Sequence, residues 1–168
     1  MSPTHAAVPI VLAVLALLVA GGFTANAVLT APVGTPAAAE FAEAPVSDTL
    51  TDATVIALGE ATHGTSEFQL ARLTLLQKVV GRGFTTLAFE EDAGSMTLVN
   101  DWVQGGKGTL TEAVNRFGFR INHTAETGAL LQWIRDYNAS APKAGRIQLY
   151  GVDAARPVQD KQVALSWL

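Results

Sequence analysis

Short apolar runs alternate with longer segments of helical spacing from residue 53 onward. Residues 53–58 form a continuous apolar run with β-branched Val55 and Ile56, which is typical of a strand buried on both faces. Residues 84–89 and 147–150 form two similar runs and predict two further strands. A helical segment separates the first two runs, which predicts a right-handed βαβ unit with parallel strands.

Between these runs, apolar residues recur at intervals of three and four, which predicts helices. Ser66 and Gln69 form the pattern of a capping box at the start of the first helix, and Thr109 and Glu112 repeat it at a later one. Glycines follow two of the helical segments, as expected after a helix. The predicted helices cover residues 66–80, 93–104, 109–117, 124–138 and a last segment that starts at 158. Their expected buried residues are Phe68, Ala71, Leu75, Leu76, Val79, Leu130, Leu131 and Ile134.

The order of these elements is β-α-β-α-α-α-β, followed by the start of a helix. This order predicts an α/β fold, a three-layer sandwich with a mainly parallel sheet, over residues 48–168. Three strands alone leave sheet edges uncovered, and the last amphipathic pattern stops at residues 166–168. We therefore expect an incomplete domain, the N-terminal part of a larger one.

The first 39 residues contain no Lys, Arg, Asp or Glu, and residues 8–23 are almost wholly apolar. Ala25, Asn26 and Ala27 then give the small-x-small pattern that signal peptidase cleaves. Two interpretations stay open: residues 1–27 are a cleaved export signal, or residues 8–23 tether the chain to a membrane. Residues 28–47, rich in Ala and Pro, are expected to be a flexible linker. Both interpretations predict an exported protein, secreted or at the cell surface.

Composition excludes several kinds of site among the 168 residues. The net charge is −4 and no basic cluster is present, which argues against nucleic acid as a partner. The absence of cysteine rules out disulfides, thiolate zinc sites and a cysteine nucleophile. No G-x-S-x-G, P-loop or H-E-x-x-H motif occurs.

Polar side chains follow each of the three predicted strands. Glu60 and His63 come after the first, Glu90 with Glu91 and Asp92 after the second, and Asp153 after the third. In open parallel sheets, ligands bind outside the carboxyl ends of the strands. The pattern therefore predicts a site at this edge, with several acidic groups and one histidine.

His63 is the strongest chemical candidate, although a lone histidine is often a hydrogen-bonded structural residue. A carboxylate three residues away can orient an imidazole and stabilise its protonated form, which suits a general base acting on water. Glu60 alone also fits a helix-capping carboxylate. Metal ligation by His63 with Glu67, or with Glu60 and Asp153, stays open, but we expect no metal or other cofactor.

The remaining candidates have structural alternatives. Glu90 is expected to project at the sheet edge, whereas Glu91 and Asp92 fit a solvated acidic turn in which Asp92 caps the next helix. Arg72 is either a surface charge or a group that reaches an acidic neighbour or a substrate oxygen. His123 fits a cap or a surface position.

With these residues assembled, the sequence resembles the erythromycin esterase family. The resemblance covers roughly residues 50–156 and rests on matches at residues 57–68 (ALGEATHGTSEF), Arg72, 87–90 (LAFE), 124–126 (TAE), 133–138 (WIRDYN) and 150–153 (YGVD).

The resemblance implies a metal-independent hydrolase that opens a macrolide lactone with water activated by a histidine. His63 would be that base, Glu60 its orienting carboxylate, and Glu90 and Arg72 further members of the catalytic cluster. Asp153 and Glu126 are expected to contact a small-molecule ester or lactone substrate.

Two departures from the family pattern matter. Family chains are more than twice as long, and a second active-site histidine lies in the part absent here, so the resemblance leaves open whether this chain is active without the rest of the domain. Residues 117–120 (FGFR) also show phenylalanine where a tryptophan is expected. A non-catalytic ligand-binding or haem-binding module of related fold is the alternative function.

Overall fold

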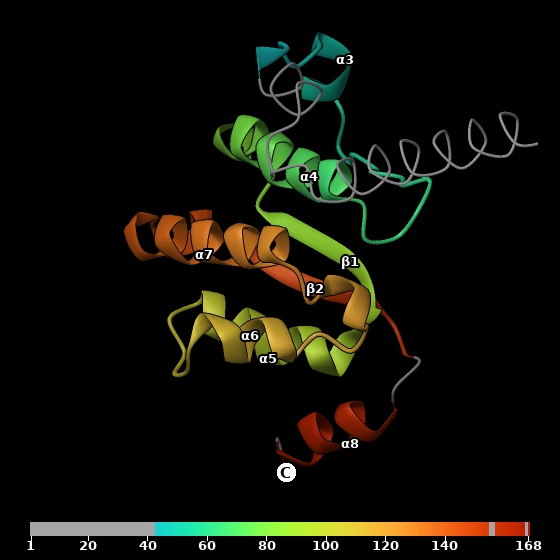
Figure 1. Ribbon diagram of the computed structural model, residues 1–168. Helices are drawn as coiled ribbons and strands as arrows, with labels where there is room; N and C mark the ends of the chain where they lie inside the picture. Colours follow the sequence, from blue (N-terminus) through green and yellow to red (C-terminus); the bar gives the residue numbers. More distant parts are fainter. Residues whose placement is uncertain (1–42, 155–156, 167) are drawn as a thin grey trace, which may run out of the picture. The chain divides into compact units, whose positions relative to one another are not determined.

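Two parallel strands and the helices packed on them form the framework of the chain (Figure 1). The structure is a computed structural model that describes residues 43–154, 157–166 and 168. In chain order, its elements are α3 (Asp48–Thr51), α4 (Ser66–Val79), the 3₁₀ turn η1 (Val80–Arg82), β1 (Thr86–Asp92), α5 (Ala93–Val103), α6 (Leu110–Asn115), η2 (Arg120–Asn122), α7 (Ala125–Ser140), η3 (Lys143–Gly145), β2 (Gln148–Asp153) and α8 (Pro157–Leu165).

The strands β1 and β2 pair in parallel, as expected for strands joined by a helical crossover. The register runs from Thr86 opposite Gln148 to Phe89 opposite Gly151, and shifts before Asp92 meets Asp153. The shift leaves two residues of β1 facing one residue of β2, which is a bulge. The α/β class predicted from the pattern is confirmed, with a parallel sheet that has two strands in the described part.

The predicted strand at residues 53–58 is wrong, because the segment is irregular in the structure. Val55 is 79% exposed and Leu58 49% exposed. The segment lies across a cavity from β1, and within the described residues no backbone–backbone hydrogen bond involves residues 53–64. An apolar run predicts burial, but a strand also needs a neighbour that pairs with its backbone. The parallel partner of β1 comes instead from the distant residues 148–153.

Most helix boundaries agree with the predictions. Asp92 caps α5 through the Ser95 amide, and Thr109 with Glu112 forms the predicted capping box of α6. The first predicted capping box is wrong: the N-cap of α4 is Thr65, and Ser66 donates its hydroxyl hydrogen bond to Glu126 instead.

The hydrophobic core lies between α4, α5, α7 and the sheet. Leu75, Leu76 and Val79 of α4 are buried as predicted, but Phe68 is 37% exposed. The largest fully buried apolar side chains of the core come from α5, α7, β2 and the residue before β2: Met96, Val99, Val103, Leu130, Leu131, Ile134, Ile147 and Leu149. Close packing of α5 on β2, with α7 packed against α5, fixes the sheet.

Side-chain amides from α5 and α7 bind the start of β2. Asn138 accepts the Ile147 amide at 2.7 Å and donates to the Ile147 carbonyl at 2.9 Å. Asn100 accepts the Leu149 amide at 2.9 Å. These bonds satisfy backbone groups that a further strand would otherwise bind.

The expectations for residues 1–27 and for most of the linker fall on residues 1–42, which lie outside the described residues. In the described part, no helix is both long and apolar enough to cross a membrane.

Candidate functional site

A short turn before α4 brings Glu60 and His63 together. The turn uses Gly64 at φ 76°, a backbone conformation that glycine adopts without strain. Nδ1 of His63 lies 2.6 Å from Oε1 of Glu60. The His63 side chain is 58% exposed and that of Glu60 22% exposed, so the carboxylate is the more enclosed partner. The predicted pairing of these two residues is therefore present in the structure.

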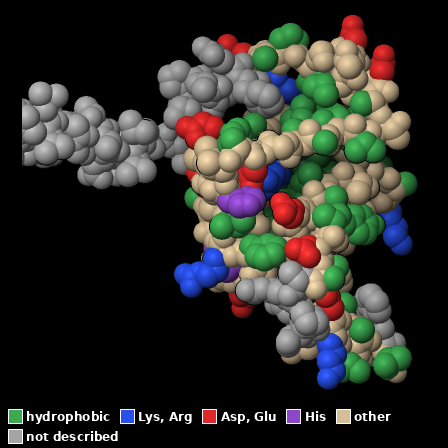
Figure 2. Space-filling model, turned by 90° about the vertical axis from the view of Figure 1, so that its right-hand side faces the viewer, with side chains coloured by type: hydrophobic (Ala, Val, Ile, Leu, Met, Phe, Trp, Pro, Cys, Tyr) green, Lys and Arg blue, Asp and Glu red, His purple; other side chains and the backbone are tan. Residues whose placement is uncertain are grey.

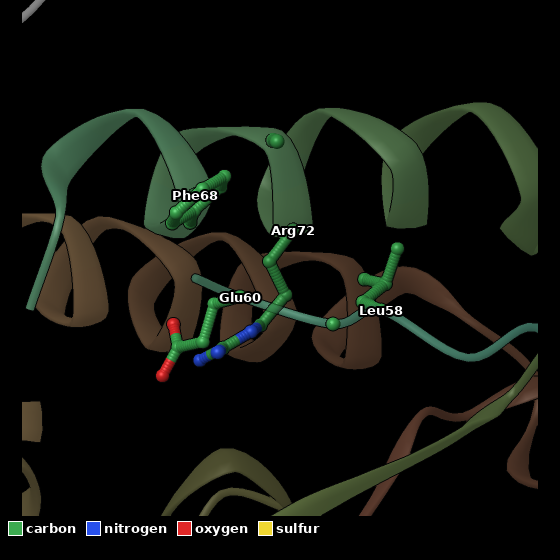
Figure 3. Close-up of a pocket in the computed structure, with 6 residues that line it drawn as sticks. Leu58, Glu60, Phe68 and Arg72 are labelled. Atoms are coloured by element: carbon green, nitrogen blue, oxygen red, sulfur yellow. The ribbon is translucent and has the colours of Figure 1, made fainter. Parts of the chain in front are cut away.

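Arg72 approaches the same turn from α4. Its guanidinium carbon lies 5.0 Å from the centre of the Phe89 ring, and Nη1 donates to Oε1 of Gln69 at 3.2 Å. Burial lowers the pKa of Arg72 from its ordinary value, and the charge of Glu60 partly offsets this by raising it. Figure 3 shows the Glu60 and Arg72 side chains side by side in a small pocket of about 50 Å³. Arg72 is thus a half-buried cation beside an acidic neighbour, one of its two predicted roles.

A larger cavity of about 820 Å³ opens beside these residues. Figure 2 shows acidic and histidine side chains near a recessed hydrophobic patch on one face of the molecule. Four predicted catalytic residues line the cavity: Glu60, His63, Arg72 and Glu90. Its walls are mostly apolar and include Val55, Ile56, Leu75, Leu76, Phe84, Leu87 and Ile121.

One carboxylate oxygen of Glu60 has no hydrogen-bond donor in the described part of the chain. This atom, Oε2, is buried, whereas Oε1 binds His63. A buried acceptor without a donor is costly, and such groups are often found at functional sites.

The two predicted substrate-binding residues lie outside this cavity lining. Asp153 ends β2, and its Oδ1 accepts the Ala154 amide at 2.7 Å. Glu126 begins α7 and accepts the Ser66 hydroxyl at 2.7 Å. That hydrogen bond is the main reason that the pKa of Glu126 is lowered. Glu126 therefore ties α7 to the end of the His63 turn.

Residues of the 117–122 loop also line the cavity, and sequence reasoning did not assign them there. They are Phe119, Ile121 and Asn122. The helical period of the flanking segments carries no information about how this loop folds back over β1. The predicted surface position of His123 is confirmed, since it is exposed.

The prediction that Glu91 is solvated is wrong, because its side chain is fully buried. Its carboxylate accepts hydrogen bonds from the 118–122 segment. Among the described residues, no group of three or more His, Cys, Asp and Glu side chains has an arrangement suited to a metal ion.

The arrangement can carry out general-base chemistry. If Nδ1 of His63 donates its proton to Glu60, the other ring nitrogen is the basic one. That nitrogen can take a proton from water at the edge of an apolar cavity. Arg72 brings a positive charge to the same cavity.

Comparisons with known proteins bear on the family of the chain. The family model described as erythromycin esterase matches residues 79–168, more than half of the chain. The erythromycin esterase type II of Escherichia coli is 35% identical over 113 residues, which are 67% of this chain and 26% of that protein. The chain therefore spans about a quarter of the length of this curated relative.

Two crystal structures are also similar. One is a Bacillus cereus protein with a TM-score of 0.51 and 31% identity, over 56% of this chain and 22% of that one. The other is a succinoglycan biosynthesis protein with a TM-score of 0.51 and 36% identity, over 57% of this chain and 24% of that one. Together with the family match, these likenesses lead to one conclusion: the chain belongs to the erythromycin esterase family.

Proposed function

We propose that this chain provides the general-base half of a hydrolase that opens an ester or lactone with water. The observation that supports this most is the 2.6 Å contact between His63 and Glu60 at the edge of the apolar cavity. A histidine oriented by a carboxylate is a common base for activating water.

In the proposed reaction, the ring nitrogen of His63 that faces away from Glu60 removes a proton from water. The resulting hydroxide attacks the carbonyl carbon, and its negative charge moves to the carbonyl oxygen. Arg72 would stabilise that charge, because its guanidinium lines the same cavity and is partly shielded from solvent. The alkoxide leaves with the proton that His63 accepted, and no metal takes part.

The proposed substrate is a small molecule with a large apolar body. A cavity of about 820 Å³ is in the range of sites that hold drug-sized ligands. The relative from Escherichia coli is described as an erythromycin esterase, and a macrolide lactone would fit this chemistry.

The proposal extends to the whole domain and its location. Tyr150 and Val152 of β2 are 54% and 71% exposed, so one face of the sheet is apolar and uncovered in the described chain. A three-layer α/β sandwich would cover that face with helices. An apolar segment at residues 8–23 supports export, with the segment as either a signal or a membrane tether.

The test is hydrolysis of p-nitrophenyl esters and of large-ring lactones by the chain and by His63→Asn. The substitution keeps a polar side chain but removes the base, so we expect turnover to fall by about 10²–10⁴-fold. Glu60→Gln is expected to lose less, because it weakens orientation and leaves the imidazole in place. Glu67→Gln, in the first turn of α4 and outside the cavity lining, is the matched control and should retain activity. Unchanged turnover in His63→Asn, or none in the wild-type chain, would contradict the proposal.

A second candidate is a binding module for an apolar small molecule, without catalysis. The size and apolar lining of the cavity favour it, because binding needs only the walls that the described chain provides. Saturable lactone binding without turnover, unaffected by His63→Asn, would favour this candidate.

A further inference from the structure

Glu91 is a buried acidic residue that has no part in the proposed reaction. Its side chain has an exposed fraction of 0%. Oε1 accepts the amides of Asp92 at 3.0 Å and of Gly118 at 3.0 Å. Oε2 accepts the Asn122 side-chain amide at 3.0 Å, and the Phe119 amide lies within 3.2 Å of both oxygens. Four donors therefore point at one carboxylate.

These donors belong to a wall of the candidate site. Phe119 and Asn122 line the large cavity together with His63 and Glu90. Three of the four donors come from residues 118–122, which are about 30 positions away in the sequence. Removing the acceptor would leave buried backbone amides without partners, which the loop could avoid only by moving.

Glu91 also controls the direction of its neighbour. The ladder of β1 and β2 shifts between Phe89 and Asp92, and both Glu91 and Asp92 are buried. Glu90, one residue earlier, is exposed and lines the cavity. Holding Glu91 inside therefore keeps the carboxylate of Glu90 on the cavity side of the bulge.

We propose that Glu91 is a positioning residue for the candidate site. Its carboxylate fixes the wall formed by residues 118–122 and keeps the side chain of Glu90 directed to the cavity. The assignment rests on the proposed function for its catalytic meaning. The chemistry requires a carboxylate because it accepts on both oxygens, whereas a glutamine would present an amide donor to other donors.

The test is a reciprocal exchange between Glu91 and its side-chain partner. Glu91→Gln places an amide donor against the donor of Asn122, and Asn122→Asp places a carboxylate against the carboxylate of Glu91. In the double variant, Glu91→Gln with Asn122→Asp, the amide at position 91 donates to the carboxylate at position 122. The hydrogen bond between the two side chains is therefore restored with its direction reversed. Asp101→Asn, at an exposed position of α5, removes the same charge and serves as the control.

The readouts are amide hydrogen exchange at Gly118 and Phe119, and the separate values of kcat and KM for an ester that the wild-type chain hydrolyses. We expect Glu91→Gln to speed exchange by at least about tenfold, because charge-assisted hydrogen bonds are lost. KM should rise by about tenfold, and kcat should change much less, because the wall binds substrate and does not react. The double variant should return both readouts to within about threefold of wild type.

Wild-type exchange and KM in Glu91→Gln would overturn the assignment, as would a double variant whose effect is only the sum of the two single ones. If circular dichroism shows that Glu91→Gln does not fold, the assignment predicts that the double variant does fold. An unfolded double variant would also overturn the assignment. A wild-type chain that hydrolyses no ester refutes the proposed function alone, since the exchange readout still decides whether Glu91 holds the wall.

Discussion

The candidate cavity has two walls that are held in different ways. The wall at the end of β1 is fixed by a strand ladder and by the buried Glu91 carboxylate. The opposite wall, residues 54–63, carries Glu60 and His63 but makes no backbone–backbone hydrogen bond within the described residues. The side chains proposed for proton transfer thus stand on the less supported wall. Their orientation depends on local contacts such as the Glu60–His63 bond.

The largest expected difference is in the free energy of unfolding, when one leucine of the core and one leucine of the 54–63 wall are each replaced by alanine. Leu130→Ala in α7 removes a side chain that is 1% exposed, and should cost about 2–5 kcal/mol of unfolding free energy. Leu58→Ala in the 54–63 wall removes one that is 49% exposed, and should cost less than about 1 kcal/mol. Urea denaturation of both variants measures the two costs. Equal costs would mean that residues 54–63 are packed as tightly as the core.

Glycine-to-alanine substitutions compare how closely the backbone is packed in the sheet and in the 54–63 wall. A Cβ at Gly151 would lie 2.5 Å from the Glu91 carbonyl oxygen and 2.6 Å from that of Asp92. Gly151→Ala should therefore destabilise the chain by about 1–3 kcal/mol, because neither backbone can yield without breaking the ladder. A Cβ at Gly59 would meet nothing within 4 Å, so Gly59→Ala should change stability by less than about 0.5 kcal/mol. Thermal melts of the two variants compare them; a stable Gly151→Ala chain would contradict the bulge geometry.

The smallest expected effect concerns the contact between Ser66, at the start of α4 just after the less supported wall, and Glu126 of α7. The Ser66 hydroxyl lowers the pKa of Glu126, so the folded state holds this carboxylate ionised to lower pH than the unfolded state does. Its stabilisation is present above the unfolded pKa and is lost as the pH falls through the lower folded pKa.

Glu126→Gln should cost at most about 1 kcal/mol at pH 7, because the group is largely solvated and screened. The difference from wild type should shrink as the pH falls below the ordinary range of glutamate. Urea denaturation at pH 7 and pH 3 measures it, and Ser66→Ala is the matched variant from the other side of the bond. A difference of equal size at both pH values would show that the bond is not the cause.

Local signals in the sequence predicted the elements with strong periodicity and clear caps. The Thr109–Glu112 capping box and the buried leucines of α7 required only neighbours in the chain. The Glu60–His63 pair was predicted for the same reason, since three residues of a turn separate them. Arg72 and Glu90 reached the same cavity from two other elements, as expected from strand ends and helix faces.

Features that depend on distant partners could not be predicted in this way. The apolar pattern of residues 53–58 predicts burial, but it does not reveal which strand pairs with β1. Glu91 looked like part of a solvated turn, because its four donors lie in a loop whose course the sequence does not reveal. The amide side chains of Asn100 and Asn138, which bind β2, give no local signal either.

Amide hydrogen exchange along the chain, with and without a large-ring lactone, tests most directly the claim that one cavity has one fixed wall and one locally supported wall. We expect the amides of residues 87 and 89, which face β2 in the parallel ladder, to be protected, and those of residues 55–63 to exchange close to their intrinsic rates until the lactone slows them. Equal protection of both segments in the free chain, or no slowing of residues 55–63 by the lactone, would contradict the account.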